Sequence, residues 1–361
     1  MLILVINCGS SSAKYQLFDI KKNKSVAKGI VEKIGEKGAV CKDHYQAIGI
    51  IRDRLLRDRK KILKDINELK GIGHRVVHGG EEFNKAVFID KKVLRSIESA
   101  SELAPLHNPP SLAGIKACKR YFSGIPQVAV FDTAFHQTMP AHSYIYGIPF
   151  DFYKKYKIRR YGFHGTSHWF VAGEAARILK KPLRKLKIIT VHLGNGCSMT
   201  AVLKGKSVDT SMGFTPLEGL IMGTRSGDID PAIVTFLMEK NKLSAEKVAE
   251  ILNKKSGLLG ISGLSNDMRD IICGMKKGNK RAKLAFDIFV YKIKKYIGAY
   301  QAVMGGADAV VLTGGIGENV PVLKNRLSNE LRSALGAKTK FMIVPTNEEL
   351  LIARDTYGLI K

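Results

Sequence analysis

Long apolar stretches are absent from this 361-residue sequence. No window approaches 18 uninterrupted apolar residues, so we expect no membrane-spanning helix. The apolar run Met1–Ile6 is short and lacks a basic flank, which argues against a secretory signal. No segment is of low complexity or forms a linker rich in proline, glycine and serine. A composition of 45% apolar and 25% charged residues is typical of a globular protein and excludes a mainly disordered chain.

Cysteine is scarce and never occurs as a CxxC pair. In disulfide scaffolds and zinc sites, cysteines are closely spaced, and here they are scattered and odd in number. The pattern therefore predicts reduced thiols in a cytoplasmic protein. The five residues are Cys8, Cys41, Cys118, Cys197 and Cys273.

Acidic residues are few, since 32 Asp and Glu face 59 Lys and Arg and leave a net charge of +27. Such a balance favours either nucleic acid or small anions as partners. The basic residues are dispersed. Their densest cluster, Arg52–Lys64, also contains Leu55, Leu56, Ile62 and Leu63, which fits a helix with one solvated face. Aromatic residues make up only 8% and do not interleave with the basic ones, so we expect no nucleic-acid partner.

Two similar strand–turn–strand units occur far apart in the chain. Leu2–Ile6 leads into the small-residue turn Asn7–Ser12 and a second strand, Ala13–Ile20. The segment Ile188–Leu203 has the same order around the turn Gly194–Ser198. Two such hairpins predict an internal duplication with one copy in each of two domains.

Strand-like and helical segments alternate through the rest of the chain, which is typical of an α/β fold. We expect further strands at Gly73–His78, Gln127–Phe131, Ala309–Leu312 and Phe341–Val344. We expect helices at Lys91–Ser101, Pro109–Tyr121, Pro231–Met238, Ala245–Leu252, Lys280–Met304 and Asn347–Leu359.

Three turns rich in glycine or serine each follow a strand: Asn7–Ser12, Gly194–Ser198 and Thr313–Asn319. Small residues let backbone N–H groups approach an anion, and hydroxyls add donors. Each turn alone could be a simple tight turn, but three of them in a basic protein favour a nucleotide phosphate site. None matches the P-loop pattern GxxxxGK[ST], and none is a GxGxxG opening a βαβ unit after the first strand.

Two motifs place a cation or an imidazole among small or apolar residues. Arg75 lies in a strand-like run, and alternation puts it on the same face as Val77. A guanidinium beside an apolar side chain suits a small carboxylate or a phosphoryl group, and the alternative is a structural ion pair. His164 and His168 have an HxxxH spacing, but Gly162 argues against a regular helix there. We therefore expect His164 to be a phosphate-contacting residue in a turn rather than a metal ligand.

Two polar residues adjoin loops. Arg225 lies in the glycine-flanked loop Met222–Asp230, and the alternative to a functional role is a solvated turn. Asp132 comes directly after the expected strand Gln127–Phe131, where a carboxylate can be catalytic or can simply cap a turn.

Ten segments, in one order along nearly the whole chain, resemble the acetate kinase (acetokinase) family, the acetate/propionate kinase group. The resemblance implies a duplicated two-domain α/β fold of the actin/hexokinase/heat-shock-ATPase kind with a nucleotide cleft between the domains. It suggests an N-terminal domain of residues 1–148, completed by a C-terminal helix at 346–361, and a nucleotide-binding domain of residues 149–345. The segments between Cys41 and Gly71 and between Val320 and Lys340 look shorter than in the family. The matching segments are VINCGSSSAKYQLFD, GHRVVHGGE, LAPLHNPPSL, FDTAFHQTMP, RRYGFHGTSH, VHLGNGCS, MGFTPLEGLIMGTRSGDIDP, SNDMRDI, TGGIGEN and PTNEELLIARDT.

The resemblance also implies four groups of functional residues. As metal ligands it implies Asn7 and Glu348. As nucleotide-binding residues it implies Ser10, Ser12, Lys14, His192, Leu193, Gly194, Asn195, Gly196, Asp267, Met268, Arg269, Gly315, Ile316, Gly317, Glu318 and Asn319. For acetate it implies Arg75 at the carboxylate and Val77, Leu106, Phe163 and Pro216 around the methyl group. As the catalytic group it implies Asp132, His164 and Arg225.

The implied reaction is reversible phosphoryl transfer from ATP to acetate, giving acetyl phosphate and ADP. It would depend on Mg²⁺, for which Mn²⁺ can substitute, in a cytoplasmic homodimer with no membrane partner. A carboxylate is already ionised at neutral pH, so the reaction needs charge neutralisation rather than a strong base. Asp132 would then orient a neighbour or link to the metal.

Three other functions stay open. A propionate kinase has the same chemistry with a roomier pocket, and the sequence does not distinguish the two. A nucleotide-switched binding protein would need a further peptide-binding domain, for which 361 residues leave little room. A nucleic-acid-binding protein would need a concentrated basic face.

Overall fold

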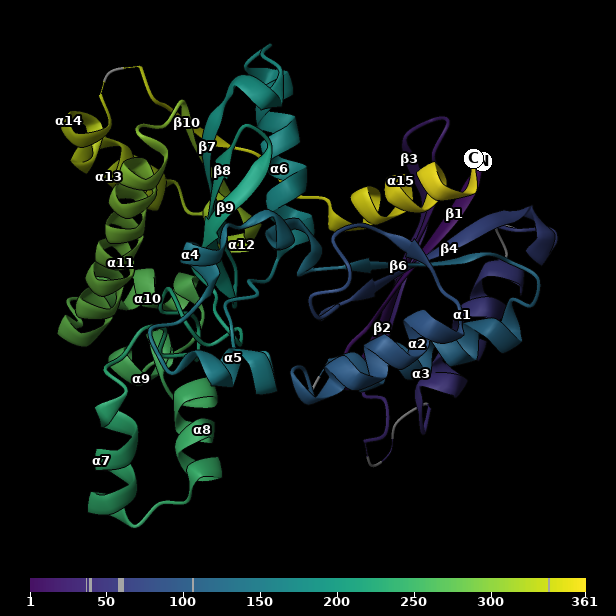
Figure 1. Cartoon of the computed structure of the whole chain (residues 1–361), viewed down its shortest axis with the longest axis horizontal. Helices are drawn as coiled ribbons and strands as arrows, with labels where there is room; N and C mark the ends of the chain where they lie inside the picture. The colour runs from purple at the N-terminus through teal and green to yellow at the C-terminus, as the bar shows by residue number, and fades with distance from the viewer. Residues whose placement is uncertain (37, 39–40, 58–61, 106, 337) are drawn as a thin grey trace. The chain divides into compact units, whose positions relative to one another are not determined.

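The computed structural model describes residues 1–361 except 37, 39–40, 58–61, 106 and 337. The chain divides into two compact units (Figure 1). Unit 1 comprises Met1–Gln137 together with Asn347–Lys361, and unit 2 comprises Thr138–Thr346. No helix among the described residues is both long and apolar enough to cross a membrane.

Unit 1 is built on a six-stranded mixed sheet in the order β3-β2-β1-β4-β6-β5. β1 and β2 form the predicted antiparallel hairpin, with Asn7 opposite Lys14. β4 runs parallel to both β1 and β6. The strands are β1 (Leu2–Cys8), β2 (Ser12–Asp19), β3 (Lys24–Glu32), β4 (Leu69–Val76), β5 (Val87–Phe88) and β6 (Gln127–Phe131).

Helices cover both faces of this sheet, which is why most residues of its central strands are buried and apolar. Leu4 and Ile6 pack with α1 (His44–Arg57) and α3 (Asn108–Tyr121). The opposite face receives α15 (Glu348–Ile360), which lies directly on Gly73 of β4. A Cβ at Gly73 would come within 2.7 Å of Ile352 Cγ2, so only glycine lets α15 approach this closely. The other helices of unit 1 are α2 (Lys91–Ser99) and the 3₁₀ turns Ile66–Glu68 and Ala100–Glu102, and the 3₁₀ turn Ala134–Thr138 spans the division between the units.

Unit 2 has a five-stranded sheet in the order β11-β10-β7-β8-β9. β7 and β8 form the second predicted hairpin, and β10 runs parallel to both β7 and β11. The order hairpin, then parallel strands, repeats that of unit 1 and confirms the predicted duplication of the hairpin. The strands are β7 (Lys187–Leu193), β8 (Cys197–Leu203), β9 (Lys206–Thr210), β10 (Ala309–Thr313) and β11 (Lys340–Ile343).

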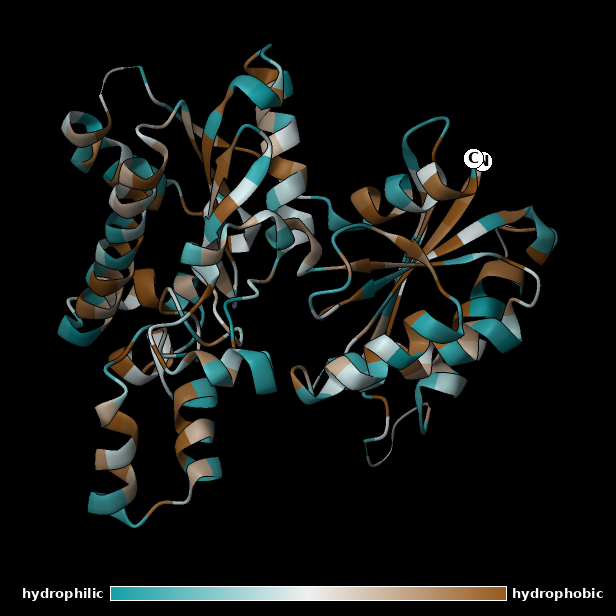
Figure 2. Ribbon diagram, viewed as in Figure 1, coloured by the Kyte–Doolittle hydropathy of each residue, from teal (hydrophilic) through white to brown (hydrophobic). Residues whose placement is uncertain are grey.

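Two long helices cover the sheet of unit 2 on opposite faces, α6 on one and α11 on the other (Figure 1). α11 buries a stripe of apolar residues that includes Phe286, Phe289 and Ile293. Figure 2 shows the strands of both sheets mainly in the hydrophobic colours and the outer helix faces mainly in the hydrophilic ones. The helices are α4 (Ala141–Tyr144), α5 (Phe150–Tyr156), α6 (Gly165–Ile178), the 3₁₀ turn Leu183–Lys185, α7 (Ala232–Asn241), α8 (Ala245–Lys254), α9 (Gly257–Ser262), α10 (Met268–Lys276), α11 (Lys280–Met304), α12 (Gly314–Asn319), α13 (Pro321–Glu330) and α14 (Arg332–Leu335).

Three boundaries differ from the prediction. Thr313–Asn319, expected as a turn, contains the short helix α12, whose first N–H is capped by the Glu318 carboxylate. β4 ends at Val76, so Val77 lies in a bend after the strand. The prediction that strand alternation puts Val77 on the same face as Arg75 was therefore wrong. The units divide after Gln137 rather than at 148, because hydrogen bonds tie the intervening segment to unit 2, including Thr138 Oγ1 to the Ser207 carbonyl.

The basic cluster Arg52–Lys64 lies partly outside the described residues. Its first part belongs to α1, which buries Ile51 and Leu55 while its arginines face outward, as the solvated-face interpretation predicted.

Candidate active site

Unit 1 gathers polar side chains where its parallel strands end. β1, β4 and β6 run in the same direction, so their carboxyl ends share one edge of the sheet. Asn7 and Arg75 each directly follow the paired residues Ile6 and His74, and Asp132 directly follows β6. This edge of an open α/β sheet is where such folds commonly bind ligands.

Arg75 is held by carboxylates from two other elements. Its Nε donates to both oxygens of Asp132, at 3.1 and 3.2 Å, and its Nη2 donates to Asp132 Oδ2 at 2.7 Å. Glu348, at the start of α15, places Oε2 3.7 Å from the same Nη2. Burial by itself would lower the pKa of Arg75. The negative charges of Asp132 and Glu348 have the larger combined effect, so the pKa of Arg75 is raised.

The ion-pair alternative left open for Arg75 is therefore what the structure shows. Asp132 is buried, with a side chain only 2% exposed, and its fork-like contact fixes the plane of the guanidinium. A contact between Arg75 and a substrate carboxylate stays a prediction. Of the residues expected beside it, Val77 is half-buried and Leu106 lies outside the described residues.

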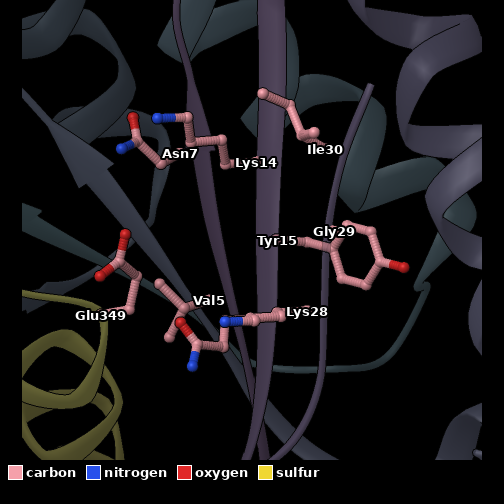
Figure 3. A pocket seen from close by; sticks show the side chains of 9 residues that line it. Val5, Asn7, Lys14, Tyr15, Lys28, Gly29, Ile30 and Glu349 are labelled. Atoms are coloured by element: carbon pink, nitrogen blue, oxygen red, sulfur yellow. The ribbon is translucent and has the colours of Figure 1, made fainter. Parts of the chain in front are cut away.

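The turn Asn7–Ser12 is closed by a hydrogen bond from the Gly9 N–H to the Ser12 carbonyl, 2.8 Å long. Ser10 is exposed and Ser12 begins β2. Beside the turn lies a pocket of about 410 Å³ on the face of the sheet that α15 covers (Figure 3). Asn7 and Lys14 lie together at one end of it, and Lys28 and Glu349 line the rest.

The donor set at this edge fits a magnesium ion held partly by its substrate. Asn7, Asp132 and Glu348 offer an amide oxygen and carboxylates, the hard ligands that Mg²⁺ prefers. No cluster of three or more His, Cys, Asp or Glu side chains suited to a metal occurs among the described residues. Mg²⁺ is commonly bound by one or two carboxylates plus substrate phosphates, so a complete protein cage is not required.

In unit 2, His164 occupies a strained position at the start of α6. Its φ of 57° lies in the left-handed region, which is unusual for a residue other than glycine. The predicted turn at His164 is thus present, and only His168 of the HxxxH pair lies within the helix. Strain of this kind is frequent at functional residues.

A chain of buried hydrogen bonds fixes the His164 ring. Its Nδ1 lies 2.8 Å from Ser198 Oγ, and that hydroxyl also lies 2.8 Å from His168 Nε2. His168 Nδ1 in turn lies 2.8 Å from Thr190 Oγ1. The sequence analysis included Ser198 only as the last residue of the predicted phosphate turn Gly194–Ser198, and it considered His168 only as a metal ligand. Neither residue was predicted to orient His164, because the contacts join positions 34 and 30 apart in the sequence.

His192 stacks on His164, with ring centroids 4.4 Å apart. Its Nδ1 is held by Ser167 Oγ at 2.8 Å, so both stacked rings are fixed through Nδ1 by a serine hydroxyl. Two imidazoles of fixed orientation therefore lie side by side at the start of α6 and the end of β7.

Arg225 lies beside the same histidine. A Cβ at Gly196 would be 3.3 Å from His164 Cε1 and 3.6 Å from Arg225 Nη1, so both side chains lie against Gly196. Arg225 donates to the Pro216 carbonyl at 3.3 Å. Burial lowers the pKa of its guanidinium, and no carboxylate of the described chain forms an ion pair with it. Phe163, next to His164, is buried.

A second pocket, of about 470 Å³, brings together three predicted nucleotide segments that are far apart in the sequence. Gly194 and Asn195 come from the turn after β7, and Asp267–Arg269 from the start of α10. The third segment is α12, which begins at Gly314 with φ of 78°. A Cβ there would lie 2.7 Å from the Leu193 carbonyl, so glycine is required. The lining residues are Gly194, Asn195, Asn266, Asp267, Met268, Arg269, Gly315, Ile316, Asn319 and Val320.

The other predicted nucleotide residues of unit 2 lie around this pocket rather than in its lining. Leu193 and Gly317 are buried in the sheet–helix core, and Glu318 caps α12. His192 and Gly196 lie on the side of His164 and Arg225.

Comparisons with known proteins agree with this picture over the full length. The Acetokinase family model matches residues 2–339. The acetate kinase of Thermoanaerobacter pseudethanolicus is 52% identical over 398 aligned positions, covering 100% of this chain and 99% of that protein. The crystal structure of Porphyromonas gingivalis acetate kinase matches with a TM-score of 0.96 and 43% identity over 100% of both chains. A propionate kinase structure from Francisella tularensis subsp. tularensis matches with a TM-score of 0.91 and 40% identity, over 99% of both chains. These matches confirm the predicted duplicated α/β fold of the actin/hexokinase kind.

Proposed function

This chain belongs to the acetokinase family, and from that premise we propose that it is an acetate kinase that transfers a phosphoryl group reversibly between ATP and acetate. The observation that carries the proposal is the position of His164 and Arg225, which both lie against Gly196 in the turn that also lines the 470 Å³ pocket. The adenosine moiety of ATP or ADP would occupy that pocket, and its terminal phosphates would extend toward these two side chains.

The arrangement suits the charge distribution of phosphoryl transfer. Negative charge on the equatorial oxygens must be stabilised in the transition state, and fixed donors do this without reorganisation. Arg225 has no protein carboxylate to neutralise it among the described residues, so its charge is directed to the phosphoryl group. His164, whose ring orientation is fixed through Ser198, would be the second donor to the phosphoryl group.

Acetate would bind at Arg75, and the family resemblance assigns Val77, Leu106, Phe163 and Pro216 to its methyl group. Its carboxylate is ionised near neutral pH and attacks without a base. Asp132 is already engaged by Arg75, which supports an orienting role for this carboxylate rather than proton abstraction.

Asn7 and Glu348 would hold Mg²⁺, or Mn²⁺ in its place. The ion would neutralise phosphate charge when bound. Lys14, opposite Asn7 in the hairpin, would add a point charge beside Ser10 and Ser12.

The experiment is trapping of acyl phosphate by hydroxylamine, with acetate, propionate and butyrate compared side by side in Mg²⁺ and ATP. We expect the highest kcat/KM for acetate, a moderately lower value for propionate and little product from butyrate. A preference for propionate would favour the second candidate, propionate kinase, which the Francisella tularensis structure supports. No acyl phosphate from any of the three would contradict both.

We also propose a cytoplasmic homodimer. α5 and α7 bury none of their own residues and expose Phe150, Phe152, Ile233 and Phe236, an apolar surface that a second copy could cover. All five cysteines are free thiols, which supports a reducing compartment. Light scattering after gel filtration tests the dimer, and a monomeric mass at micromolar concentration would contradict it.

A further inference from the structure

The loop of residues 210–219, here called the Pro216 loop, joins β9 to the segment that carries Arg225. Pro216 lies near its far end, and the Pro216 carbonyl accepts the hydrogen bond from Arg225. A second segment, residues 160–164, carries Phe163 and His164. How firmly these two segments are held together therefore fixes the spacing of Phe163, His164, Pro216 and Arg225.

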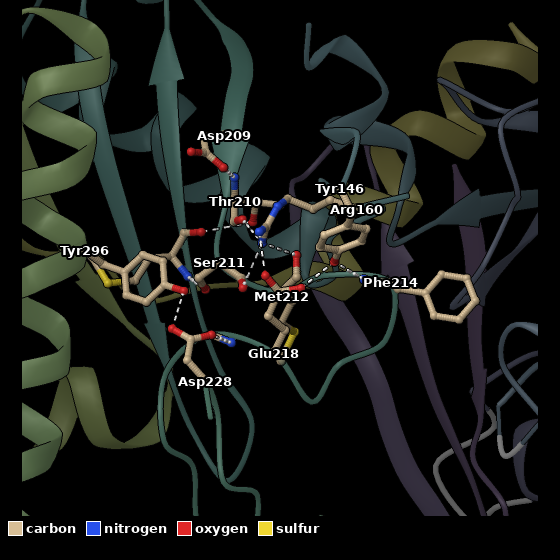
Figure 4. Close-up of polar contacts among 12 residues, drawn as sticks. Tyr146, Arg160, Asp209, Thr210, Ser211, Met212, Phe214, Glu218, Asp228 and Tyr296 are labelled. Carbon is tan, nitrogen blue, oxygen red and sulfur yellow. Dashed lines mark hydrogen bonds and ion pairs between the residues drawn. The ribbon is translucent and has the colours of Figure 1, made fainter. Parts of the chain in front are cut away.

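One guanidinium ties the Pro216 loop at both ends. Nη1 of Arg160 donates to the carbonyls of Thr210 at 2.9 Å and Ser211 at 3.2 Å, and lies 3.4 Å from that of Met212 (Figure 4). Nη2 of the same residue forms an ion pair with Glu218 Oε1 at 2.5 Å. Arg160 and Glu218 are largely shielded, with side chains 17% and 32% exposed. A fork of this shape requires arginine, because a lysine ammonium cannot reach both ends.

The middle of the Pro216 loop is linked to the Glu218 carboxylate through Tyr146. The Tyr146 hydroxyl contacts Glu218 Oε2 and accepts a hydrogen bond of 2.8 Å from the Phe214 N–H (Figure 4). The Gly213 carbonyl accepts from the Tyr161 N–H at 3.1 Å, which joins the loop directly to the Phe163 segment. A Cβ at Gly213 would overlap both the Glu218 carboxylate and the Tyr146 hydroxyl.

The loop has other anchors that do not involve Arg160. Asp228 accepts from the Gly219 N–H at 2.7 Å and from the Tyr296 hydroxyl of α11 at 2.8 Å (Figure 4). At its other end the loop continues from β9, which pairs with β8. Removal of Arg160 should therefore loosen the loop between two retained anchors rather than unfold unit 2.

We propose that Arg160 is a positioning residue that sets acyl-group selectivity by clamping the Pro216 loop against the segment that carries Phe163 and His164. The inference rests on the proposed function, since it concerns the carboxylate substrate of that same site. Arg160 touches no reacting atom. It acts through the position of Pro216 and through the carbonyl that orients Arg225.

The test compares kinetic constants in Arg160→Met and Arg160→Lys with the wild type. Arg160→Met should raise KM for acetate about tenfold and lower kcat by up to about 10²-fold, since small misplacements carry such effects. The ratio of kcat/KM for acetate to that for propionate should approach one, because a loosened wall no longer excludes the extra methylene. Arg160→Lys should recover only part of the selectivity, and ADP affinity by calorimetry should change less than twofold in both.

A steric variant tests the clamp while leaving Arg160 in place. Gly213→Ala should displace Glu218 and Tyr146 and reproduce the loss of selectivity. Gly173→Ala in α6 is the matched control, because a Cβ there meets nothing within 4 Å, and its acetate-to-propionate ratio should equal that of the wild type.

The outcomes separate this inference from the proposed function. Selectivity lost in Arg160→Met and Gly213→Ala, with ADP affinity kept, supports the clamp. If both variants keep the wild-type ratio and KM for acetate, whatever their melting temperature, the residue is merely structural and the inference is wrong. A wild type that forms no acyl phosphate contradicts the proposed function itself.

Discussion

The two units present their cationic side chains in opposite electrostatic settings. In unit 1, Arg75 is paired with Asp132 and approached by Glu348. In unit 2, Arg225 contacts a carbonyl and a thioether but forms no ion pair within the described chain, and His164 is held by a neutral hydroxyl. A paired arginine has a fixed orientation and little net field, which suits a singly charged carboxylate. An arginine that is only half-buried and has no ion-pair partner within the described chain keeps its field for a highly charged phosphoryl group.

Removing the divalent ion should have the largest effect, because the ion would neutralise phosphate charge. The described residues of unit 1 offer too few ligands for a complete metal site, so substrate phosphates would complete it. We expect a chelator to abolish acyl phosphate formation, and added Mg²⁺ or Mn²⁺ to restore it. Full turnover in metal-free buffer would show that the oxygen-rich edge of unit 1 has another purpose.

Arg225→Ala should lower kcat by about 10³- to 10⁵-fold, the range for loss of a positioned arginine in phosphoryl transfer. ADP affinity should change little, since Arg225 does not line the 470 Å³ pocket. Arg177→Ala is the control, because that arginine is 72% exposed on α6 and pairs with Glu174 at the surface. A kcat above a tenth of the wild-type value would remove Arg225 from the catalytic group.

Asp132→Asn should test the difference between the paired and the unpaired arginine, because it removes the negative charge beside Arg75 and leaves Arg75 in place. We expect kcat/KM for acetate to fall about 10²-fold as Arg75 loses its orientation. Arg75→Ala should in addition take the guanidinium away from the buried Asp132 carboxylate, and breaking a buried ion pair in this way costs about 3–5 kcal/mol of folding stability. Denaturant unfolding and acetate kinetics measure the two effects. The double variant Arg75→Ala, Asp132→Asn should recover stability but not activity, and recovery of both would contradict a role in binding acetate.

Ser198→Ala should lower kcat by about tenfold or more, because Nδ1 of His164 loses the hydroxyl that fixes the ring and its tautomer. His168→Gln should act in the same direction and more weakly, since it leaves Ser198 in place. Steady-state kinetics should show the change in kcat with little change in KM for ATP. Wild-type kcat in both variants would mean that the hydrogen-bond chain does not serve His164.

Lowering the pH should reduce the folding stability of unit 1. The reaction rate at neutral pH should not depend on this effect. Burial lowers the pKa of His74 to about 4, although its hydrogen bond to Gln127 opposes the shift. The unfolded chain takes up a proton near pH 6.5 and the folded unit does not, so this contribution to stability is present above pH 6.5 and is lost as the pH falls toward 4. The loss is on the order of 3 kcal/mol. Urea unfolding at pH 7 and 4.5 should show it, and His74→Gln should reduce the pH dependence. An unchanged dependence in that variant would assign the effect to other groups.

Local pattern in the sequence determined most of the elements. Both hairpins, the helix Lys280–Met304 and the buried strand Gln127–Phe131 stand where apolar periodicity and turn residues placed them. The same local motifs carried the resemblance to the acetokinase family, because the residues that surround a phosphate come in short, glycine-rich runs. Segments without such a signature were missed, among them β3 and the helix α6, whose start is obscured by Gly162 and the left-handed His164.

Only the tertiary structure decided which partner each of these side chains meets. Arg75 and Asp132 are 57 positions apart, and His164 and Ser198 are 34 apart, so no local pattern reveals their pairing. The same holds for Arg160, which the sequence presents as one more basic residue beside a glycine-rich motif and the fold turns into a clamp on a loop 50 positions away. Secondary structure follows from backbone preferences within a few residues. The charge state and orientation of a site residue follow from groups that only the packing of strands and helices brings within hydrogen-bond distance.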